Sequence, residues 1–395
     1  MFSRIPAWLR VAPALFVMAW GGNHFTPLLH LYEQIGHYTT LDVNLLLGLY
    51  VLGLIPGLLL AGPISDHRGR KPVTIAGVLL SIAGNAVIAA GLGNLVVLCA
   101  GRLLAGVGVG IAMAVGTSWI KELSSRPFDT RADAAAGARR PSLALTLGFG
   151  LGAGVSGVLA QWGPFPALVP YGIHVLVSAL ALVPLAAAPE TLAAPARGSL
   201  WRDLRVPLAG HARFVRVVLP AAPWIFGAAG LAYAVMPQLV ADKTGSLSLA
   251  YATLLTVLTL GTGALVQPLV KRLNELTHGR AMVVGMALML AGVLLAVINA
   301  RMLSPVLALV AALTLGAAYG ICIVAGLIEV QRIAGPEDLA GITGVYYSLA
   351  YAGFLLPTVL AAFAALTTYT VLLAVLAVLC AACLALVSRG LRRAA

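Results

Sequence analysis

The chain has very little charge. Asp, Glu, Lys and Arg make up 10% of its 395 residues, whereas apolar residues make up 61% and the mean hydropathy is +0.98. Soluble domains carry about 25% charged residues. This scarcity excludes a soluble globular protein. It predicts an all-α polytopic membrane protein.

Reactive side chains are also few and scattered. The four cysteines lie in apolar runs without His or acidic neighbours, so we expect no disulfide and no metal site. Cys380 and Cys383 share a helix face, which packing explains. The seven histidines form no cluster of the kind that metal or acid–base chemistry needs. We therefore expect neither an enzyme nor a cofactor.

Long apolar runs, separated by short polar breaks, fill most of the chain. About 20 helical residues cross a bilayer core of ~30 Å. The runs predict twelve spans, at about residues 11–31, 43–63, 73–93, 95–120, 141–162, 166–187, 217–240, 249–270, 281–299, 304–328, 340–363 and 368–388.

The basic residues gather on one side of these spans. Of 25 Lys and Arg residues, 22 fall on one side, Lys243 and Arg301 on the other, and Arg102 inside a span. The positive-inside tendency then places both termini in the cytoplasm, in what we expect to be a bacterial inner membrane. This topology accounts for the net charge of +12 without a nucleic-acid partner.

The loop between the second and third spans has a specific pattern. Gly62-x-x-x-Asp66-x-x-Gly69-Arg70-Lys71 resembles the loop motif of the major facilitator superfamily of secondary transporters. An ordinary positive loop is the alternative, but it needs no Asp and no glycines at fixed spacing. In the second half of the chain, the segment Gln267-Pro-Leu-Val-Lys271-Arg272 occupies the corresponding loop and matches the motif only in part.

The resemblance implies two pseudo-symmetric six-helix bundles that expose a cavity between them to each side in turn. We place the first bundle at residues 1–188, a cytoplasmic linker at 189–216 and the second bundle at 217–395. The motif residues would act in gating, with Asp66 contacting the cytoplasmic start of span 11 near Leu339, next to Glu337 and Asp338. We expect a monomer whose partners are a small solute and the bilayer.

Two further spans carry family-like patterns. Arg102, followed by Gly106, resembles the family's span-4 motif, and an arginine at this depth costs roughly 2.5–3.5 kcal/mol. Snorkelling to the surface is the alternative. The glycines of span 5 (148, 150, 152, 154 and 157) resemble a weakened antiporter motif in which Ala153 replaces the family's proline. Close helix packing explains these glycines equally well.

Span 1 carries the polar residues that could bind a proton. Trp20, Asn23, His24 and Pro27 recur at helical spacing on one face. We take His24, Asp42 and Arg102 as coupling candidates, with the proton as coupling ion and entering at His24 or Asp42. A structural histidine bonded to a backbone carbonyl is the alternative for His24.

Aromatic and hydroxyl side chains recur on the other predicted cavity-lining spans. Tyr347, Tyr351 and Phe354 lie on one helical face, although packing or an interfacial belt also explains single aromatics. The full set of substrate-cavity candidates is Trp20, Asn23, His24, Arg102, Gly106, Met113, Trp224, Phe226, Tyr233, Thr256, Thr259, Tyr319, Tyr347, Tyr351 and Phe354.

The middle third of the spans contains no Asp or Glu. A desolvated organic cation would need such a carboxylate, so we expect neutral, zwitterionic or anionic solutes. The pattern of span 5 favours proton-coupled export of hydrophobic or drug-like compounds. Uptake or exchange of an organic anion or other metabolite is the alternative, favoured by Arg102 and the missing proline. A membrane enzyme or a sensor is the alternative from another class.

Overall fold

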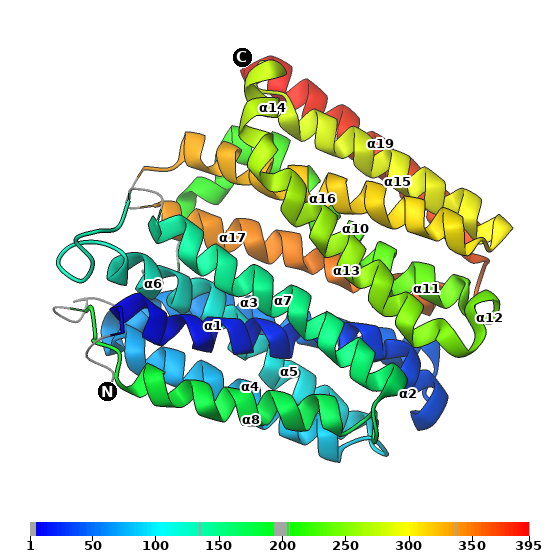
Figure 1. Cartoon of the computed structure of the whole chain (residues 1–395). Coiled ribbons are helices and arrows are strands. Elements are labelled where there is room, and N and C mark those ends of the chain that lie inside the picture. Colours follow the sequence, from blue (N-terminus) through cyan, green and yellow to red (C-terminus); the bar gives the residue numbers. More distant parts are fainter. Residues whose placement is uncertain (1–4, 134–135, 193–203, 205, 336–337, 395) are drawn as a thin grey trace. The chain divides into compact units, whose positions relative to one another are not determined.

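The structure, a computed structural model, describes residues 5–133, 136–192, 204, 206–335 and 338–394, all of whose regular structure is helical (Figure 1). The chain divides into two compact units. Unit 1 comprises Met1–Tyr32 and Leu49–Arg205, and unit 2 comprises Glu33–Gly48 and Val206–Ala395. The outer end of the second span therefore packs with the second half of the chain.

Unit 1 contains the helices of the first half, apart from the segment 33–48. In chain order they are α1 (Ala7–Asn23), η2 (Thr26–Leu28), α2 (Leu29–Gly36), α3 (Thr40–Arg68), α4 (Arg70–Ala90), α5 (Leu95–Ile111), η3 (Ala112–Gly116), α6 (Thr117–Leu123), α7 (Ala136–Trp162) and α8 (Val169–Ala186).

Unit 2 contains the helices of the second half. They are η4 (Pro207–Gly210), η5 (Phe214–Val218), α10 (Leu219–Gly230), η6 (Leu231–Val235), α11 (Met236–Leu239), α12 (Ala241–Thr244), η7 (Gly245–Leu247), α13 (Ser248–Val266), η8 (Gln267–Leu269), α14 (Val270–Leu276), α15 (Ala281–Met302), α16 (Pro305–Ile333), α17 (Leu339–Ala352), η9 (Gly353–Leu355), α18 (Leu356–Phe363) and α19 (Tyr369–Ala394).

These elements confirm the expected twelve-span membrane fold. Among the described residues, eleven helices are long and apolar enough to cross a bilayer. The twelfth, which is the first span, is broken: α1 ends at Asn23 and the chain continues through η2 into α2. Pro27 fits the start of this short 3₁₀ turn because it needs no backbone N–H there.

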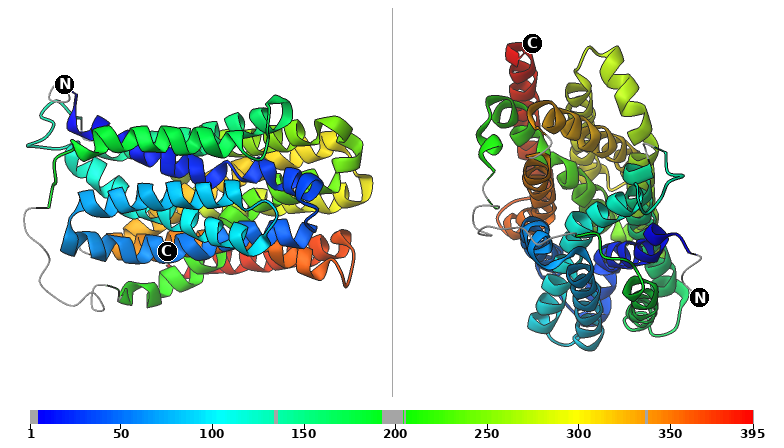
Figure 2. Two further views of the ribbon diagram at one scale, coloured as in Figure 1. Left: turned by 90° about the horizontal axis from the view of Figure 1, so that it is seen from below. Right: turned by 90° about the vertical axis from the view of Figure 1, so that its left-hand side faces the viewer.

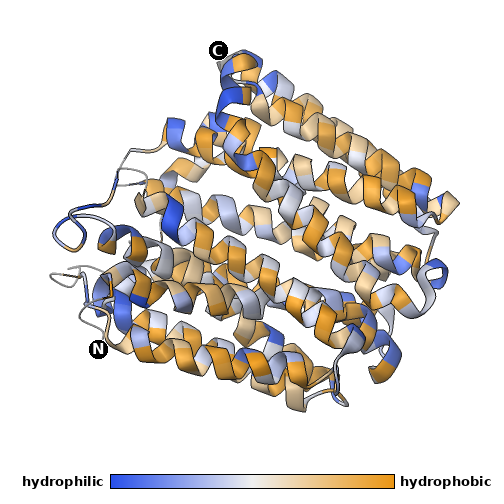
Figure 3. Ribbon diagram, viewed as in Figure 1, coloured by the Kyte–Doolittle hydropathy of each residue, from blue (hydrophilic) through white to orange (hydrophobic). Residues whose placement is uncertain are grey.

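Hydrophobicity is distributed as a bilayer requires. Hydrophilic residues gather at the helix ends and in the connections, whereas the helix bodies are largely hydrophobic (Figure 3). Large apolar side chains such as Leu265, Val306 and Val378 remain 77, 70 and 69% exposed. In water such exposure would drive aggregation, but on a membrane span these side chains face lipid.

Small residues set the spacing of helices in unit 1. Helix α1 packs on both α7 and α8 (Figure 2). A Cβ atom on Gly148 would collide with the carbonyl oxygen of Phe16, and one on Gly152 would lie 2.8 Å from the Cα of Trp20. Gly150 has open space around it. Close packing against α1 therefore requires two of the span-5 glycines, as the alternative interpretation anticipated.

Candidate functional site

The predicted gating motif lies at the junction of α3 and α4. Gly62 and Asp66 belong to the last turns of α3, and Arg70 and Lys71 open α4. Gly69 joins the two helices with φ of 101° and ψ of 153°, a region that essentially only glycine occupies. A Cβ at Gly69 would also lie 2.6 Å from Oε2 of Glu190, whereas Gly62 has no atom within 4 Å of the same position.

Arg70 is the centre of the motif's ion pairs. Its guanidinium contacts Oδ1 of Asp66 at 2.5 Å and Oε1 of Glu122 at 3.0 Å. The same group donates to Oγ of Ser65 at 2.5 Å. Arg70 thereby ties the end of α3 to α6. Within unit 1, Asp66 is thus held beside its own motif; its predicted role at the start of span 11 stays a prediction, and Glu337 lies outside the described residues.

Two acidic residues that we did not predict complete this network. Glu122 Oε2 accepts a hydrogen bond from the hydroxyl of Thr191. Glu190 caps α4, because its oxygens accept from the backbone amides of Arg70 and Lys71 at 3.0 and 2.9 Å. The run Pro189-Glu190-Thr191 after span 6 is the only sequence signal for this role.

Electrostatics keep the cap charged. Partial burial alone would raise the pKa of the Glu190 carboxyl, but the amide hydrogen bonds from Lys71, Leu192, Arg70 and Thr191 outweigh it and lower that pKa below its ordinary value. A carboxylate at a helix N-terminus is also favoured by the helix dipole. The ionised carboxylate of Glu190 is therefore the form that caps α4.

His24 lies at the break of the first span, where α4 and α8 meet it. Its Nε2 lies 2.7 Å from Oδ1 of Asn85, whose Nδ2 donates to the Ser81 carbonyl at 2.8 Å. Because Oδ1 can only accept, His24 Nε2 carries the hydrogen. His24 is fully buried, and its Nδ1 has no hydrogen-bond partner among the described residues.

His174, which we did not predict, faces His24 from α8. The two ring centroids are 5.1 Å apart. Nε2 of His174 lies 2.8 Å from the carbonyl oxygen of Val17 and therefore donates to it. Its Nδ1 is likewise buried without a hydrogen-bond partner among the residues described. The pair thus offers two bare ring nitrogens in a desolvated site.

Trp20 and Asn23, the neighbouring residues of the predicted span-1 face, contact different helices. Trp20 tilts against His174 with 6.4 Å between ring centroids. Asn23 instead points to α7, where its Nδ2 donates to the Phe149 carbonyl at 3.0 Å, and its Oδ1 accepts from Thr26. Both residues belong to α1, and their side chains contact α8 and α7 respectively.

Arg102 is fully buried in α5, which rules out snorkelling. Its guanidinium carbon lies 4.3 Å from the ring centroid of Phe25 and 4.7 Å from that of Tyr50. Desolvated cation–π contacts of this kind contribute about 2 kcal/mol each. Gly106 brings α3 close enough, because a Cβ there would collide with the Tyr50 carbonyl.

One aromatic chain joins Arg102 to the histidines. Phe25 packs on Tyr32, the Tyr32 hydroxyl donates to that of Tyr171 at 3.0 Å, and Tyr171 packs edge-on against His24. The two predicted coupling candidates thus belong to one buried cluster. Met113, predicted on the same face of span 4, lies in the π-helical turn η3 and is only partly buried.

Asp42, the third coupling candidate, belongs to unit 2 and caps α3. Its Oδ2 accepts from the amide and the hydroxyl of Thr39 at 3.0 and 2.7 Å, and Thr39 Oγ1 accepts from the Asp42 amide at 3.2 Å. This is a capping box. The carboxylate of Asp42 therefore stabilises the first turn of α3.

Unit 2 gathers most of its predicted aromatics around Phe226 of α10. The Phe226 ring stacks on Tyr351 with 4.0 Å between centroids and on Phe354 with 5.0 Å, and Tyr319 lies at 5.5 Å. Tyr233 reaches Phe354 at 6.1 Å. We call these five residues the aromatic cluster. It forms because Gly353 of η9 lets the chain approach the Pro223 carbonyl of α10.

The other unit 2 candidates have different surroundings. Tyr347 packs on Tyr346 with 5.4 Å between ring centroids. Trp224 is buried in α10. The Thr256 and Thr259 hydroxyls donate to carbonyls one turn back in α13, at 2.8 and 2.7 Å. Those hydroxyl hydrogens are thus already bonded.

Unit 2 also contains a buried acid at the inner end of α16. Glu329 is 2% exposed, and its two oxygens contact Arg213 at 2.5 Å and Arg332 at 3.2 Å. The sequence showed Glu329 near the inner end of span 10 but not these partners. Within the described parts of the chain, no group of His, Cys, Asp and Glu is arranged to hold a metal ion.

Comparison with known proteins gives consistent matches. The family model described as Major Facilitator Superfamily matches residues 11–356. The crystal structure of a mutant of the nucleoside transporter NupG superimposes with a TM-score of 0.76 at 12% identity, covering 97% of this chain and 99% of that one. The human organic anion transporter MFSD10 (TETRAN) gives 0.67 at 19% identity, over 97% and 99%.

A curated sequence relative matches over a shorter region. The high glucose sensor RGT2 of Saccharomyces cerevisiae is 31% identical over 160 residues, which is 39% of this chain. The match spans a fifth of the sensor's own length.

Proposed function

The chain belongs to the Major Facilitator Superfamily, and from this premise we propose a secondary active transporter that works by alternating access and couples a proton to the export of small hydrophobic compounds. It is an integral membrane transporter of a small solute, not an enzyme. The solute class, the direction and the coupling ion are the proposed part.

The aromatic cluster is the observation that carries the proposed solute class. Phe226, Tyr351 and Phe354 present stacked rings without a charged group. Tyr319 is partly buried and adds a ring and a hydroxyl to this cluster. Aromatic rings of this kind favour a planar, uncharged or weakly polar solute through stacking and apolar contact.

The histidine pair supports proton coupling. A proton arriving at Nδ1 of His24 or His174 would find an acceptor that the described fold leaves without a hydrogen bond. The nearby guanidinium of Arg102 would oppose that charge, so the proton would bind only transiently. We place the proton at His24 rather than at Asp42, because the carboxylate of Asp42 is occupied in its capping box.

An organic anion is the second candidate solute, and Arg102 favours it. A buried guanidinium in a desolvated site can bind a carboxylate or phosphate strongly. One fold neighbour is named as an organic anion transporter, although its identity to this chain is only 19%. Ligand-induced shifts in melting temperature separate the two solutes: Arg102→Ala should abolish the shift by anions and retain the shift by neutral compounds.

Flux in proteoliposomes tests the proposal. Purified protein is reconstituted with or without a pH gradient, and the movement of neutral planar dyes is compared with that of quaternary ammonium dyes. We expect gradient-driven movement of the neutral dyes, which His24→Gln abolishes and Asp42→Asn retains. Flux that ignores the gradient would refute proton coupling. Binding without any flux would indicate a sensor.

A further inference from the structure

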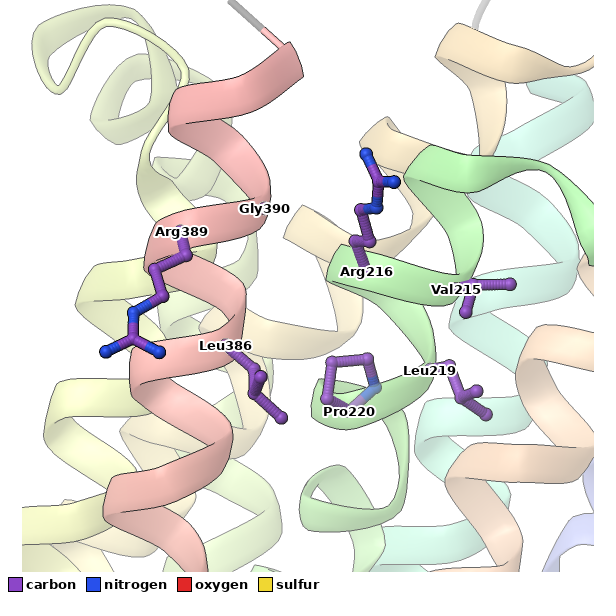
Figure 4. A pocket seen from close by; sticks show the side chains of 7 residues that line it. All are labelled: Val215, Arg216, Leu219, Pro220, Leu386, Arg389 and Gly390. Carbon is purple, nitrogen blue, oxygen red and sulfur yellow. The ribbon is translucent and has the colours of Figure 1, made fainter.

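A cleft separates the start of span 7 from the end of span 12 in unit 2. It measures about 400 Å³, within the ~300–1,000 Å³ typical of small-molecule sites. Figure 4 shows the side chains that line it, which come from η5, α10 and α19: Val215, Arg216, Leu219, Pro220, Leu386, Arg389 and Gly390.

Helix α19 approaches η5 closely at Gly390, beside the cleft. A Cβ on Gly390 would lie 2.7 Å from the Arg216 carbonyl oxygen and 3.1 Å from a Val217 methyl, so only glycine permits the contact. Below it, Leu386 and Pro220 face each other across the gap (Figure 4). Leu386 and Leu219 are 53 and 40% exposed. On a membrane span such side chains meet lipid.

Two arginines flank this apolar floor, one on each side of the cleft. Arg216 and Arg389 are exposed, and neither forms an ion pair within the described residues. Arg213, one turn before Arg216, instead points inward to the buried Glu329. Arg213 therefore stabilises the fold through its ion pair with Glu329, whereas Arg216 is available to bind a ligand.

The predicted topology places these two arginines at the level of the lipid headgroups. Arg389 is close to the C-terminal end of α19, and Arg216 precedes α10, at the membrane side where we predict the termini. In Figure 4 the Arg216 guanidinium extends beyond the apolar floor, whereas the Arg389 side chain turns to the face of α19 that points away from the cleft. Both are long exposed side chains that can change rotamer to reach a shared anion.

We propose that this cleft binds an anionic phospholipid. One acyl chain lies along Leu219, Pro220 and Leu386, and the phosphate bonds to Arg216 and Arg389. Basic pockets between membrane helices on the cytoplasmic side are sites of this kind. We expect an anionic headgroup because the two arginines attract its negative charge. The cationic group of a zwitterionic lipid would instead be repelled by them. The apolar floor requires a lipid rather than a free anion.

Melting of the detergent-purified full chain tests this site. Phosphatidylglycerol should raise the melting temperature more than phosphatidylcholine, and inorganic phosphate should not raise it. Arg216→Gln with Arg389→Gln should remove the advantage of phosphatidylglycerol, with an apparent Kd about fivefold weaker for each arginine lost. Lys271→Gln with Arg272→Gln, an exposed pair outside the cleft, should keep that advantage.

Three outcomes would overturn the proposal. They are an undiminished phosphatidylglycerol effect in the double arginine variant, equal stabilisation by the two lipids, or a full effect of inorganic phosphate. If the double variant does not fold, the single variants and Leu386→Gln replace it. Leu386→Gln leaves the charge unchanged and should weaken phosphatidylglycerol binding through the acyl chain alone; unchanged binding in all three variants would also overturn the proposal.

Discussion

Glu190 holds the first turn of α4 from a position 120 residues away from Arg70. One carboxylate oxygen accepts from the amide of Arg70 at 3.0 Å and the other from that of Lys71 at 2.9 Å. The gating motif is therefore built around an acid outside it, and Gly69 is the residue that lets this acid approach.

Glu190→Ala should lower the free energy of unfolding by about 0.5–2 kcal/mol, the usual contribution of a helix cap. The pKa of this carboxyl is lowered in the fold, so its contribution is present above the unfolded value and is lost as the pH falls through the folded value. Melting curves of both proteins between pH 3 and 7 should therefore converge at the acid end. Glu275→Ala, an exposed acid, is the control.

Substitution of the two motif glycines Gly62 and Gly69 by alanine should change the stability of the fold in opposite directions. Gly69→Ala forces a non-glycine residue into its φ and ψ region, at a cost of order 1–3 kcal/mol, and crowds Glu190. A Cβ at Gly62 would have no atom within 4 Å, and Gly62 lies inside a helix. Gly62→Ala should therefore stabilise the fold by up to about 1 kcal/mol. Thermal unfolding of the two variants measures the difference. Equal effects would show that the motif glycines are not distinguished by backbone geometry.

Glu329→Gln should be among the most destabilising single changes in unit 2. It leaves Arg213 and Arg332 facing a neutral group in a site where the acid is 2% exposed, and breaking such a pair costs about 3–5 kcal/mol. Arg332→Gln should cost far less, because its side chain is 40% exposed and Arg213 still pairs with the acid. Denaturant titration of both variants measures the ratio, and similar losses would contradict this account.

Phe226→Ala should weaken the binding of neutral planar solutes more than Tyr347→Ala does. Phe226 stacks on two rings of the aromatic cluster, whereas Tyr347 packs on Tyr346. Because removal of a buried phenyl ring also costs about 3–5 kcal/mol of stability, the ligand-induced shift in melting temperature is compared rather than the melting temperature itself. Equal shifts in the two variants would remove the aromatic cluster from solute binding.

Local patterns in the sequence predicted much of this structure. Run length and the loop motif predicted twelve spans, and the cost of burying charge singled out Arg102 and His24, which are both fully buried. The helical repeat of span 11 predicted a shared face for Tyr347, Tyr351 and Phe354. Tyr351 and Phe354 do lie together, whereas Tyr347 packs on Tyr346.

Partners from distant segments were not predictable in the same way. Glu122 lies 52 residues from Arg70, and His174 lies 157 residues from Val17. Such contacts depend on which helix faces pack together, and a single sequence does not specify this. Asn23 and His24 likewise have partners on different helices, Phe149 of α7 and Asn85 of α4.

The central claim, a proton exchanged for the exported solute at the histidine pair, is tested most directly by the internal pH of proteoliposomes when solute is added without an imposed gradient. The account predicts a solute-dependent pH change that His24→Gln and His174→Gln each abolish and the exposed-site control His278→Asn retains. A pH change of the same size in both buried-histidine variants, or solute flux without any pH change, would contradict it.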